Sequence, residues 1–269
     1  MITSLKNDRV RLVRALQERR RVRQRERRFV VEGIRLCEEA ARAGFRPHFV
    51  FYTDQARQDE RALSLLSHWE RAGVPCEEVS PEVMEACSDT ETPQGLLAVV
   101  PIPELPFPQR PTLLLILDRI RDPGNLGTIL RTAWAAGVEG ALLAPGTVDA
   151  TNPKAVRAGM GAHFHLPLLA ADWEEIPLLV EGCRVYLADA RGELSYTDAD
   201  WTSRVALIVG GEAEGAGNQA RALARATVAI PMAAGVESLN TAVAAAVLLF
   251  EAVRQRRAAS EKRDADLRR

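Results

Sequence analysis

The apolar residues of the chain form short runs that alternate with segments of helical period. Residues 112–118 read TLLLILD, a nearly continuous apolar stretch that is typical of a central parallel strand buried on both faces. Further strand-type runs follow it, and helical segments lie among them. This alternation predicts a parallel α/β sheet for the second half of the chain. The expected strands span 112–118, 140–143, 184–188, 205–209 and 227–230, and the expected helices span 125–136, 153–158, 173–181 and 239–257.

The first half repeats the pattern on a smaller scale. Gly44 and Gly73 follow two helical segments, where glycine commonly ends a helix, and Pro81 suits the first turn of another. We expect a compact α/β/α domain of about 70 residues, closed by the strand at 96–100 and preceded by a basic helix at 8–23. The expected strands span 29–33, 48–52, 77–80 and 96–100, and the expected helices span 34–44 and 60–72.

A proline-rich segment separates the two halves. Residues 101–111 read PIPELPFPQRP, and the five prolines disfavour both a helix and a central strand. This segment is therefore expected to be a linker. The predicted organisation is a basic N-terminal helix or arm at 1–28, a small α/β domain at 29–100, the linker at 101–111, a larger α/β domain at 112–257 and a charged tail at 258–269.

Charge is distributed unevenly along the chain. The formal net charge is −1, yet residues 1–30 carry eleven Lys or Arg against three acidic residues. A basic segment on an acidic body suits contact with a nucleic-acid backbone, whose binding is largely electrostatic, although a solvated helix face is the alternative. Arginine forks match phosphate oxygens, which favours RNA contact. The candidate RNA contacts are Arg19, Arg20, Arg21, Arg23 and Arg25.

Composition narrows the class of protein further. Of the 269 residues, 47% are hydrophobic, which suits a globular protein, and the longest apolar stretch, 241–250, is too short to span a bilayer. The chain opens on charged residues and not on an apolar signal segment, so we expect a cytoplasmic protein without a membrane partner. Its four cysteines are scattered without CxxC or zinc-like spacing, and we expect no metal site.

Three polar, glycine-containing segments follow predicted strands, where open α/β sheets bind ligands. They are NxGxxxR (Asn125, Gly127, Arg131), GxExxG (Gly210, Glu212, Gly215) and IPM…SLN (Ile230 to Asn240). In this order they resemble the three motifs of the SpoU family, also called TrmH-like, of RNA 2'-O-ribose methyltransferases in the SPOUT superfamily. In the first half, RFVVEGIRLCEEA and SDTETPQGLLAVV resemble the substrate-binding domain that precedes the catalytic domain in many SpoU members.

The resemblance implies a fold and a reaction. The fold is α/β, a parallel-sheet SPOUT catalytic domain with a C-terminal trefoil knot, preceded by a small α/β/α RNA-binding domain. The implied methyl donor is S-adenosyl-L-methionine (SAM), and the implied substrate is RNA, with large-subunit ribosomal RNA favoured and transfer RNA as the alternative. A homodimer with the active site at its interface is also implied. The apolar last helix supports it, because Leu248, Leu249 and Phe250 cannot all face one small core.

The resemblance assigns catalytic roles to five residues. Arg131 corresponds to the family's proposed proton acceptor, or it clamps the phosphate, since an arginine normally stays charged. Asn125 would orient the nucleotide, and Glu212 would bind a ligand or hold Arg131 of another subunit. Ser238 and Asn240 would face the reacting centre, and either could cap the helix that follows.

A second set of residues is expected to bind the methyl donor. Adenine would be recognised mainly by backbone groups, with Leu239 in apolar contact. Glu214 ranks after Glu212, because it lies off the family pattern. The candidate cofactor-binding residues are Ala188, Gly210, Gly211, Ile230, Met232 and Leu239.

Two other classes of function fit the sequence less well. A catalytically silent RNA-binding protein of the same fold is disfavoured, because all five candidate catalytic residues are present. A nucleotide-dependent oxidoreductase is disfavoured, because the segment DPGNLG after the strand at 112–118 lacks the GxGxxG spacing of dinucleotide-binding folds.

Overall fold

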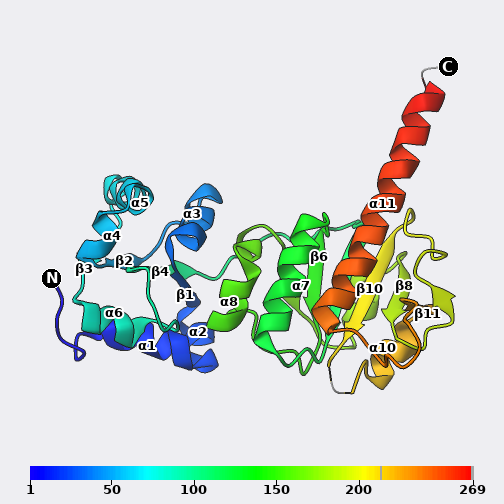
Figure 1. The fold of residues 1–269 in the computed structure, drawn as a ribbon, viewed down its shortest axis with the longest axis horizontal. Helices are drawn as coiled ribbons and strands as arrows, with labels where there is room; N and C mark the ends of the chain where they lie inside the picture. Colours follow the sequence, from blue (N-terminus) through cyan, green and yellow to red (C-terminus); the bar gives the residue numbers. More distant parts are fainter. Residues whose placement is uncertain (213, 268–269) are drawn as a thin grey trace. The chain divides into compact units, whose positions relative to one another are not determined.

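The computed structural model describes residues 1–212 and 214–267, which form two compact units (Figure 1). The N-terminal unit comprises residues 1–104 and 149–165, and the C-terminal unit comprises residues 105–148 and 166 onward. The segment 149–165 lies within the predicted domain at 112–257. In the structure this segment belongs to the N-terminal unit, because its Val156 and Phe164 pack into the hydrophobic core of that unit.

The N-terminal unit contains a four-stranded sheet between two layers of helices. The strands are β1 (Arg28–Glu32), β2 (Phe49–Tyr52), β3 (Cys76–Glu78) and β4 (Leu96–Pro101), and the helical elements are α1 (Asp8–Glu18), α2 (Arg20–Glu26), α3 (Ile34–Arg42), α4 (Asp54–Arg57), α5 (Glu60–Arg71), α6 (Pro81–Cys87), α8 (Pro153–Gly159) and η1 (Ala162–Phe164). The strand order is β1-β4-β2-β3, and β4 runs antiparallel to both of its neighbours. Strand β4, the last of the four in sequence, therefore lies inside the sheet between β1 and β2.

Alternation along the strands divides the core of the N-terminal unit between the two faces of its sheet. Val31 and Val50 belong to the cluster that includes residues of α3, α5 and α8. Val30 and Phe51 belong to the cluster that includes residues of α1 and α6. Figure 1 shows α3 and α5 on one side of this sheet and α1 and α6 on the other. The expected α/β/α layering is confirmed.

Helix α1 belongs to this core. Asn7 caps its N-terminus, and Val10, Val13 and Leu16 are fully buried. The apolar spacing of these residues places them on one face of the helix, which packs on the sheet. The predicted basic helix at 8–23 corresponds to α1 and α2, and its basic residues project from a layer of the domain itself.

Arg23 of α2 is tied into the fold. Only 3% of its surface is exposed, and its guanidinium donates two hydrogen bonds to Asp149 Oδ2, at 2.7 and 3.0 Å. A further bond runs to the carbonyl oxygen of Leu16 at 2.7 Å. A buried arginine with its donors occupied cannot also contact a phosphate, so its assignment to RNA binding is corrected to a structural role. The other four candidates, Arg19, Arg20, Arg21 and Arg25, are exposed.

The described part of the C-terminal unit is built on a seven-stranded sheet. Its strands are β5 (Leu113–Asp118), β6 (Gly140–Leu143), β7 (Leu168–Ala170), β8 (Arg184–Ala188), β9 (Leu194–Ser195), β10 (Val205–Gly210) and β11 (Ala226–Ala229), in the order β7-β6-β5-β10-β8-β11-β9. All pairings between these strands are parallel. Strand β5 lies between β6 and β10 and is buried along its whole length. The predicted parallel sheet with a central apolar strand is confirmed.

Helices cover both faces of this sheet. Helices α7 (Pro123–Ala135) and α11 (Thr241–Leu267) contact each other on one face (Figure 1). Helices α9 (Ile176–Leu179) and α10 (Asn218–Leu223) contribute to the hydrophobic cluster on the other. Helix α9 covers only part of the predicted segment at 173–181, and α10 was not predicted.

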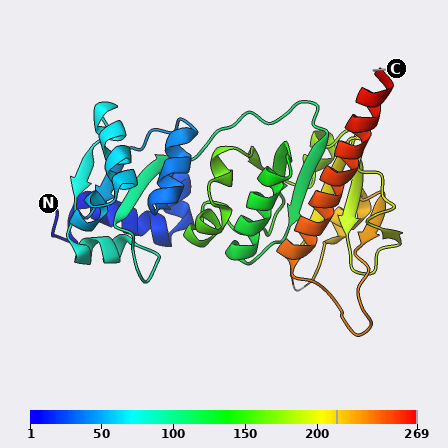
Figure 2. The same cartoon turned by 45° about the horizontal axis from the view of Figure 1, so that its top comes forward.

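Helix α11 is longer than the sequence indicates. It continues to Leu267, through most of the predicted tail at 258–269, so the described part of that tail is helical; residues 268 and 269 lie outside the described chain. The helix extends past the sheet (Figure 2). Leu248 and Leu249 are buried, whereas Phe250 is 50% exposed, which confirms that these three side chains do not share one core.

Candidate active site

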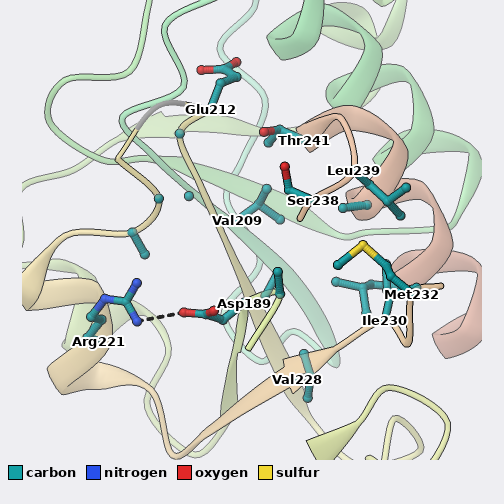
Figure 3. Close-up of a pocket in the computed structure, with 18 residues that line it drawn as sticks. Asp189, Val209, Glu212, Arg221, Val228, Ile230, Met232, Ser238, Leu239 and Thr241 are labelled. Atoms are coloured by element: carbon teal, nitrogen blue, oxygen red, sulfur yellow. Dashed lines mark hydrogen bonds and ion pairs between the residues drawn. The ribbon is translucent and has the colours of Figure 1, made fainter. Parts of the chain in front are cut away.

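A cavity of about 270 Å³ opens at the carboxyl ends of strands in the C-terminal unit (Figure 3). Strands β8 and β10 end there at Ala188 and Gly210. The segment 230–240, which loops out between β11 and α11 in Figure 2, supplies further lining residues. Ligands bind at this edge of parallel sheets. All six predicted cofactor-binding residues line the cavity: Ala188, Gly210, Gly211, Ile230, Met232 and Leu239.

The two sides of the cavity differ in character. Ile230, Met232 and Leu239 gather on one side, and Asp189 and Arg221 lie across from them (Figure 3). Arg221 Nη1 donates to Asp189 Oδ2 at 2.8 Å. Burial raises the pKa of Asp189, but hydrogen bonds from a backbone N–H and from Arg221 outweigh burial and bring this pKa below its ordinary value. The cavity therefore combines an apolar side with a charged carboxylate.

Sequence reasoning missed Asp189 and Arg221. Both lie outside the three motif segments, and neither has an unusual sequence context. One signal was present, since Asp189 directly follows the predicted strand at 184–188, and polar residues at the carboxyl end of a parallel strand face the ligand edge of the sheet.

The three motif segments are joined by hydrogen bonds through Asn125. Asn125 Nδ2 donates to Glu212 Oε1 at 2.9 Å, and Asn240 Nδ2 donates to Asn125 Oδ1 at 3.1 Å. The backbone N–H of Arg121 donates to Glu212 Oε2 at 3.3 Å. One hydrogen-bonded chain therefore joins the start of α7, the loop after β10 and the start of α11 beside the cavity.

This network sets the charge of Glu212. Partial burial raises its pKa, but hydrogen bonds from Asn125 and from several backbone N–H groups bring the pKa below its ordinary value. An ionised carboxylate can accept bonds at both oxygens, as Glu212 does here. At neutral pH Glu212 is therefore a charged acceptor and not a proton donor.

Asn125 and Asn240 are also fixed by the helix ends that carry them. Asp122 caps α7 by accepting the backbone N–H of Asn125 at 2.8 Å. Asn240 Oδ1 accepts two backbone N–H groups at the start of α11, at 2.9 and 3.3 Å. Asn240, and not Ser238, is thus the cap of α11. Ser238 is exposed and lines the cavity instead.

Arg131 lies apart from the cavity of its own chain. It is exposed on α7, six residues beyond Asn125, which corresponds to about 9 Å along a helix axis. It is not among the described residues that line the cavity. Trp134, three residues further on and 37% exposed, lies on the same helix face. The other four predicted catalytic residues come together at or beside the cavity.

Glycine is required where the GxExxG loop passes close to other backbone. A Cβ on Gly210 would lie 2.4 Å from the backbone nitrogen of Ala216, and one on Gly211 would lie 2.2 Å from the carbonyl oxygen of Arg119. Neither position admits a side chain unless the main chain moves. These two glycines therefore let the loop fold tightly along the cavity.

Other features of the described chain bear on its chemistry. Among the described residues, no group of three or more His, Cys, Asp or Glu is placed to hold a metal ion. No helix in the described part of the chain is long and apolar enough to cross a membrane. The four cysteines are free, and burial raises the pKa of the Cys87 thiol to about 12.

Residues 112–250, which include the three motif segments, match the SpoU rRNA Methylase family. The chain belongs to this family. Residues 7–98 match the MRM3-like substrate binding domain and include α1 of the N-terminal unit, which agrees with the packing of that helix in the domain core. The resemblance inferred from the motifs is confirmed.

Named relatives cover both units of the chain. The 23S rRNA (guanosine(2553)-2'-O)-methyltransferase RlmP of Bacillus subtilis is 35% identical, over 93% of this chain and 97% of its own length. The 23S rRNA (uridine(2479)-2'-O)-methyltransferase of Streptomyces viridochromogenes is 34% identical, over 95% and 92%. The crystal structure of the SpoU methyltransferase AviRb from Streptomyces viridochromogenes, in complex with the cofactor AdoMet, has a TM-score of 0.84 at 32% identity and covers 93% of this chain and 98% of its own.

Proposed function

We propose that this SpoU-family protein is a SAM-dependent 2'-O-ribose methyltransferase that acts on large-subunit ribosomal RNA. The meeting of the three motif segments at one cavity carries the proposal: Glu212, Asn125 and Asn240 are hydrogen-bonded beside it. The names of the two relatives give the same reaction on 23S rRNA. Because those names specify a guanosine in one case and a uridine in the other, family membership does not fix the nucleotide.

The cavity suits SAM in size and in chemistry. Its volume of about 270 Å³ is close to the lower end of the range for small-molecule sites. Ile230, Met232 and Leu239 offer apolar contact to an adenine ring, and the Asp189 carboxylate can accept hydrogen bonds from hydroxyl or ammonium groups of the donor. AviRb, which shares the fold, holds AdoMet in its crystal structure. Bound SAM supplies a methyl group already activated by a sulfonium.

The protein must then align the ribose hydroxyl and promote loss of its proton. Asn125 and Glu212 present fixed polar groups beside the cavity, where they can orient a nucleotide. Ser238 lines the same edge. Arg131 either accepts the proton or binds the adjacent phosphate so that the hydroxyl ionises more readily. The second role is favoured, because a guanidinium stays charged at neutral pH.

We further propose that the active protein is a homodimer in which Arg131 of one subunit reaches the cavity of the other. Helices α7 and α11 contact each other and carry Trp134, Val243 and Phe250, which are 37%, 50% and 50% exposed. Exposed apolar side chains on adjoining helices mark an interaction surface, and closed two-fold dimers are the commonest oligomers. Arg131 shares a helix face with Trp134, so pairing through this face brings Arg131 to the partner.

The proposed reaction is tested by transfer of tritium from labelled SAM to purified RNA. We expect incorporation into large-subunit ribosomal RNA and not into transfer RNA. Calorimetry with SAM alone provides the parallel measurement of donor binding. If the protein binds SAM but labels no RNA, the enzyme assignment is wrong and the silent RNA-binding alternative holds. We also propose that the protein acts in the cytoplasm, in line with its bacterial 23S rRNA methyltransferase relatives.

Replacing Arg19, Arg20, Arg21 and Arg25 together by glutamine is expected to weaken RNA binding and reduce its salt dependence. The salt slope should fall by roughly one unit for each phosphate that the protein no longer neutralises. These side chains are exposed on or beside α2, within the segment that matches a substrate binding domain. Fluorescence anisotropy at several salt concentrations measures the slope. Turnover at saturating RNA should change little, because these residues lie in the N-terminal unit and the cavity lies in the C-terminal unit.

Arg23→Gln is the matched control for this variant. It removes one partner of a buried ion pair and is expected to lower the free energy of unfolding by about 3–5 kcal/mol, without changing the salt slope of the folded protein. Thermal unfolding measures the loss. If the fourfold variant keeps the wild-type salt slope, the exposed arginines are only a solvated helix face.

A further inference from the structure

Arg119 has a backbone conformation that its place in the chain does not explain. Of the described residues other than glycine, three have a positive φ: Arg27, Arg119 and Met160. Arg27 and Met160 end α2 and α8, where a left-handed residue commonly terminates a helix. Arg119, with a φ of 60°, instead follows the last residue of β5. Side chains disfavour this region, so the strain must be held by surrounding contacts.

Those contacts are with the GxExxG loop. Arg119 Nη1 donates to Glu214 Oε2 at 3.0 Å, and Arg119 Nη2 donates to the carbonyl oxygen of Gly215 at 3.3 Å. The neighbouring Asp118, which is 1% exposed, accepts the backbone N–H of Gly217 at 2.6 Å. Two consecutive residues, the last residue of β5 and the one that follows it, therefore hold the loop by three hydrogen bonds.

Glycines leave room for the arginine at this position. A Cβ on Gly217 would lie 3.2 Å from Arg119 Nη2, and a Cβ on Gly146 would lie 2.9 Å from Arg119 Cγ. The side chain thus packs closely against both glycines and is only 30% exposed. Arg119 does not itself line the proposed SAM cavity, whereas Gly211, Glu212 and Gly215 of the loop do. Arg119 therefore holds the loop that forms this part of the cavity wall, on the side away from the cavity.

We propose that Arg119 is a positioning residue for the methyl donor. Its left-handed backbone directs the guanidinium at the loop, and the guanidinium holds the loop in the shape that binds SAM. The strained backbone of Arg119 then serves SAM binding and does not stabilise the fold. This role rests on the proposed function, because it takes the cavity to be the SAM site.

The test replaces Arg119 by residues that tolerate a positive φ. Arg119→Gly and Arg119→Asn relieve the backbone strain but remove both hydrogen bonds to the loop. We expect the Kd for SAM, measured by calorimetry, to rise by about tenfold, the size of effect expected for removing a charged hydrogen bond. We expect the Tm to stay constant or to rise by roughly 2–4 °C, because the strain is relieved. In steady state, KM for SAM should rise, while KM for RNA and kcat at saturation should stay near wild type.

Two further variants serve as controls. Arg184→Ala removes an ion pair outside the cavity lining, in which Arg184 Nη1 lies 3.4 Å from Asp200 Oδ2, and should leave the Kd for SAM within about twofold of wild type. Arg119→Lys keeps a positive charge facing Glu214 and should recover part of the affinity that Arg119→Asn loses.

A positioning role predicts weaker SAM binding with an unchanged or higher Tm. A purely structural role predicts that SAM affinity and Tm both fall. The proposal is overturned if Arg119→Gly and Arg119→Asn bind SAM like wild type. It is also overturned if affinity and Tm fall together, because Arg119 would then only support the fold. Failure of the wild-type protein to bind SAM would overturn the proposed function, and this inference with it.

Discussion

Replacing Arg131 by alanine is expected to reduce methyl transfer by about 10²- to 10⁴-fold while SAM affinity changes by no more than a few-fold. Arg131 is exposed on α7 and does not line the described cavity of its own chain, so its loss should not disturb donor binding. Single-turnover transfer to ribosomal RNA and calorimetry with SAM measure the two effects. Tm should stay near wild type, because an exposed helical arginine makes a small contribution to stability.

Arg131→Lys distinguishes the two chemical roles left open for this residue. A phosphate clamp needs positive charge, so lysine should restore a measurable part of the transfer rate. A specific proton-accepting role of the guanidinium would leave Arg131→Lys as inactive as Arg131→Ala. Loss of SAM binding in a folded Arg131→Ala protein would contradict the assignment of Arg131 to the RNA side of the reaction.

Mixing two inactive variants is expected to restore activity. If Arg131 acts in the cavity of the partner subunit, an Arg131→Ala chain paired with a Ser238→Ala chain forms one site with both residues intact and one site with neither. After random exchange of subunits, about half of the dimers are mixed, and total activity should return to about a quarter of wild type on this symmetry argument. Transfer assays before and after subunit exchange measure the recovery.

The matched control mixes Glu212→Gln with Ser238→Ala. Both residues line the same cavity in one chain, and exchange leaves every site with at least one defect, so no activity should return. A protein that is monomeric in solution and fully active would contradict the dimer proposal, as would equal activity of the two mixtures. The predicted contact surface is tested by Phe250→Asp, an exposed position whose charge should weaken the dimer.

The seven-stranded sheet could be predicted from the sequence, because its central strands are buried on both faces and appear as apolar runs. Strands β6 and β8 have the predicted bounds. Strands β7 and β9 span three and two residues and are not fully buried, so neither is long enough to be recognised as a strand in the sequence. Helix α11 was predicted to end at 257, because its charged C-terminal half continues the helix beyond the apolar pattern. The trefoil knot stays a prediction from the family resemblance.

The residues of the candidate site could be predicted from the sequence where they belong to the family motifs. The hydrogen-bonded chain from Glu212 through Asn125 to Asn240 joins residues far apart in sequence, and only the motif order brought them together in advance. Arg23 shows the limit of reasoning from charge patterns. It sits among exposed arginines, but its burial depends on Asp149, more than a hundred residues away, and no local pattern reveals that pairing.

The chemical position of the transferred methyl group tests the central claim most directly. Ribosomal RNA labelled by the protein with tritiated SAM is hydrolysed in alkali, which requires a free 2'-hydroxyl to cleave each linkage. A 2'-O-methyl group blocks cleavage, so the account predicts that the label appears in alkali-resistant dinucleotides. Label in ordinary mononucleotides would place the methyl group on a base and would contradict ribose 2'-O-methylation by this chain.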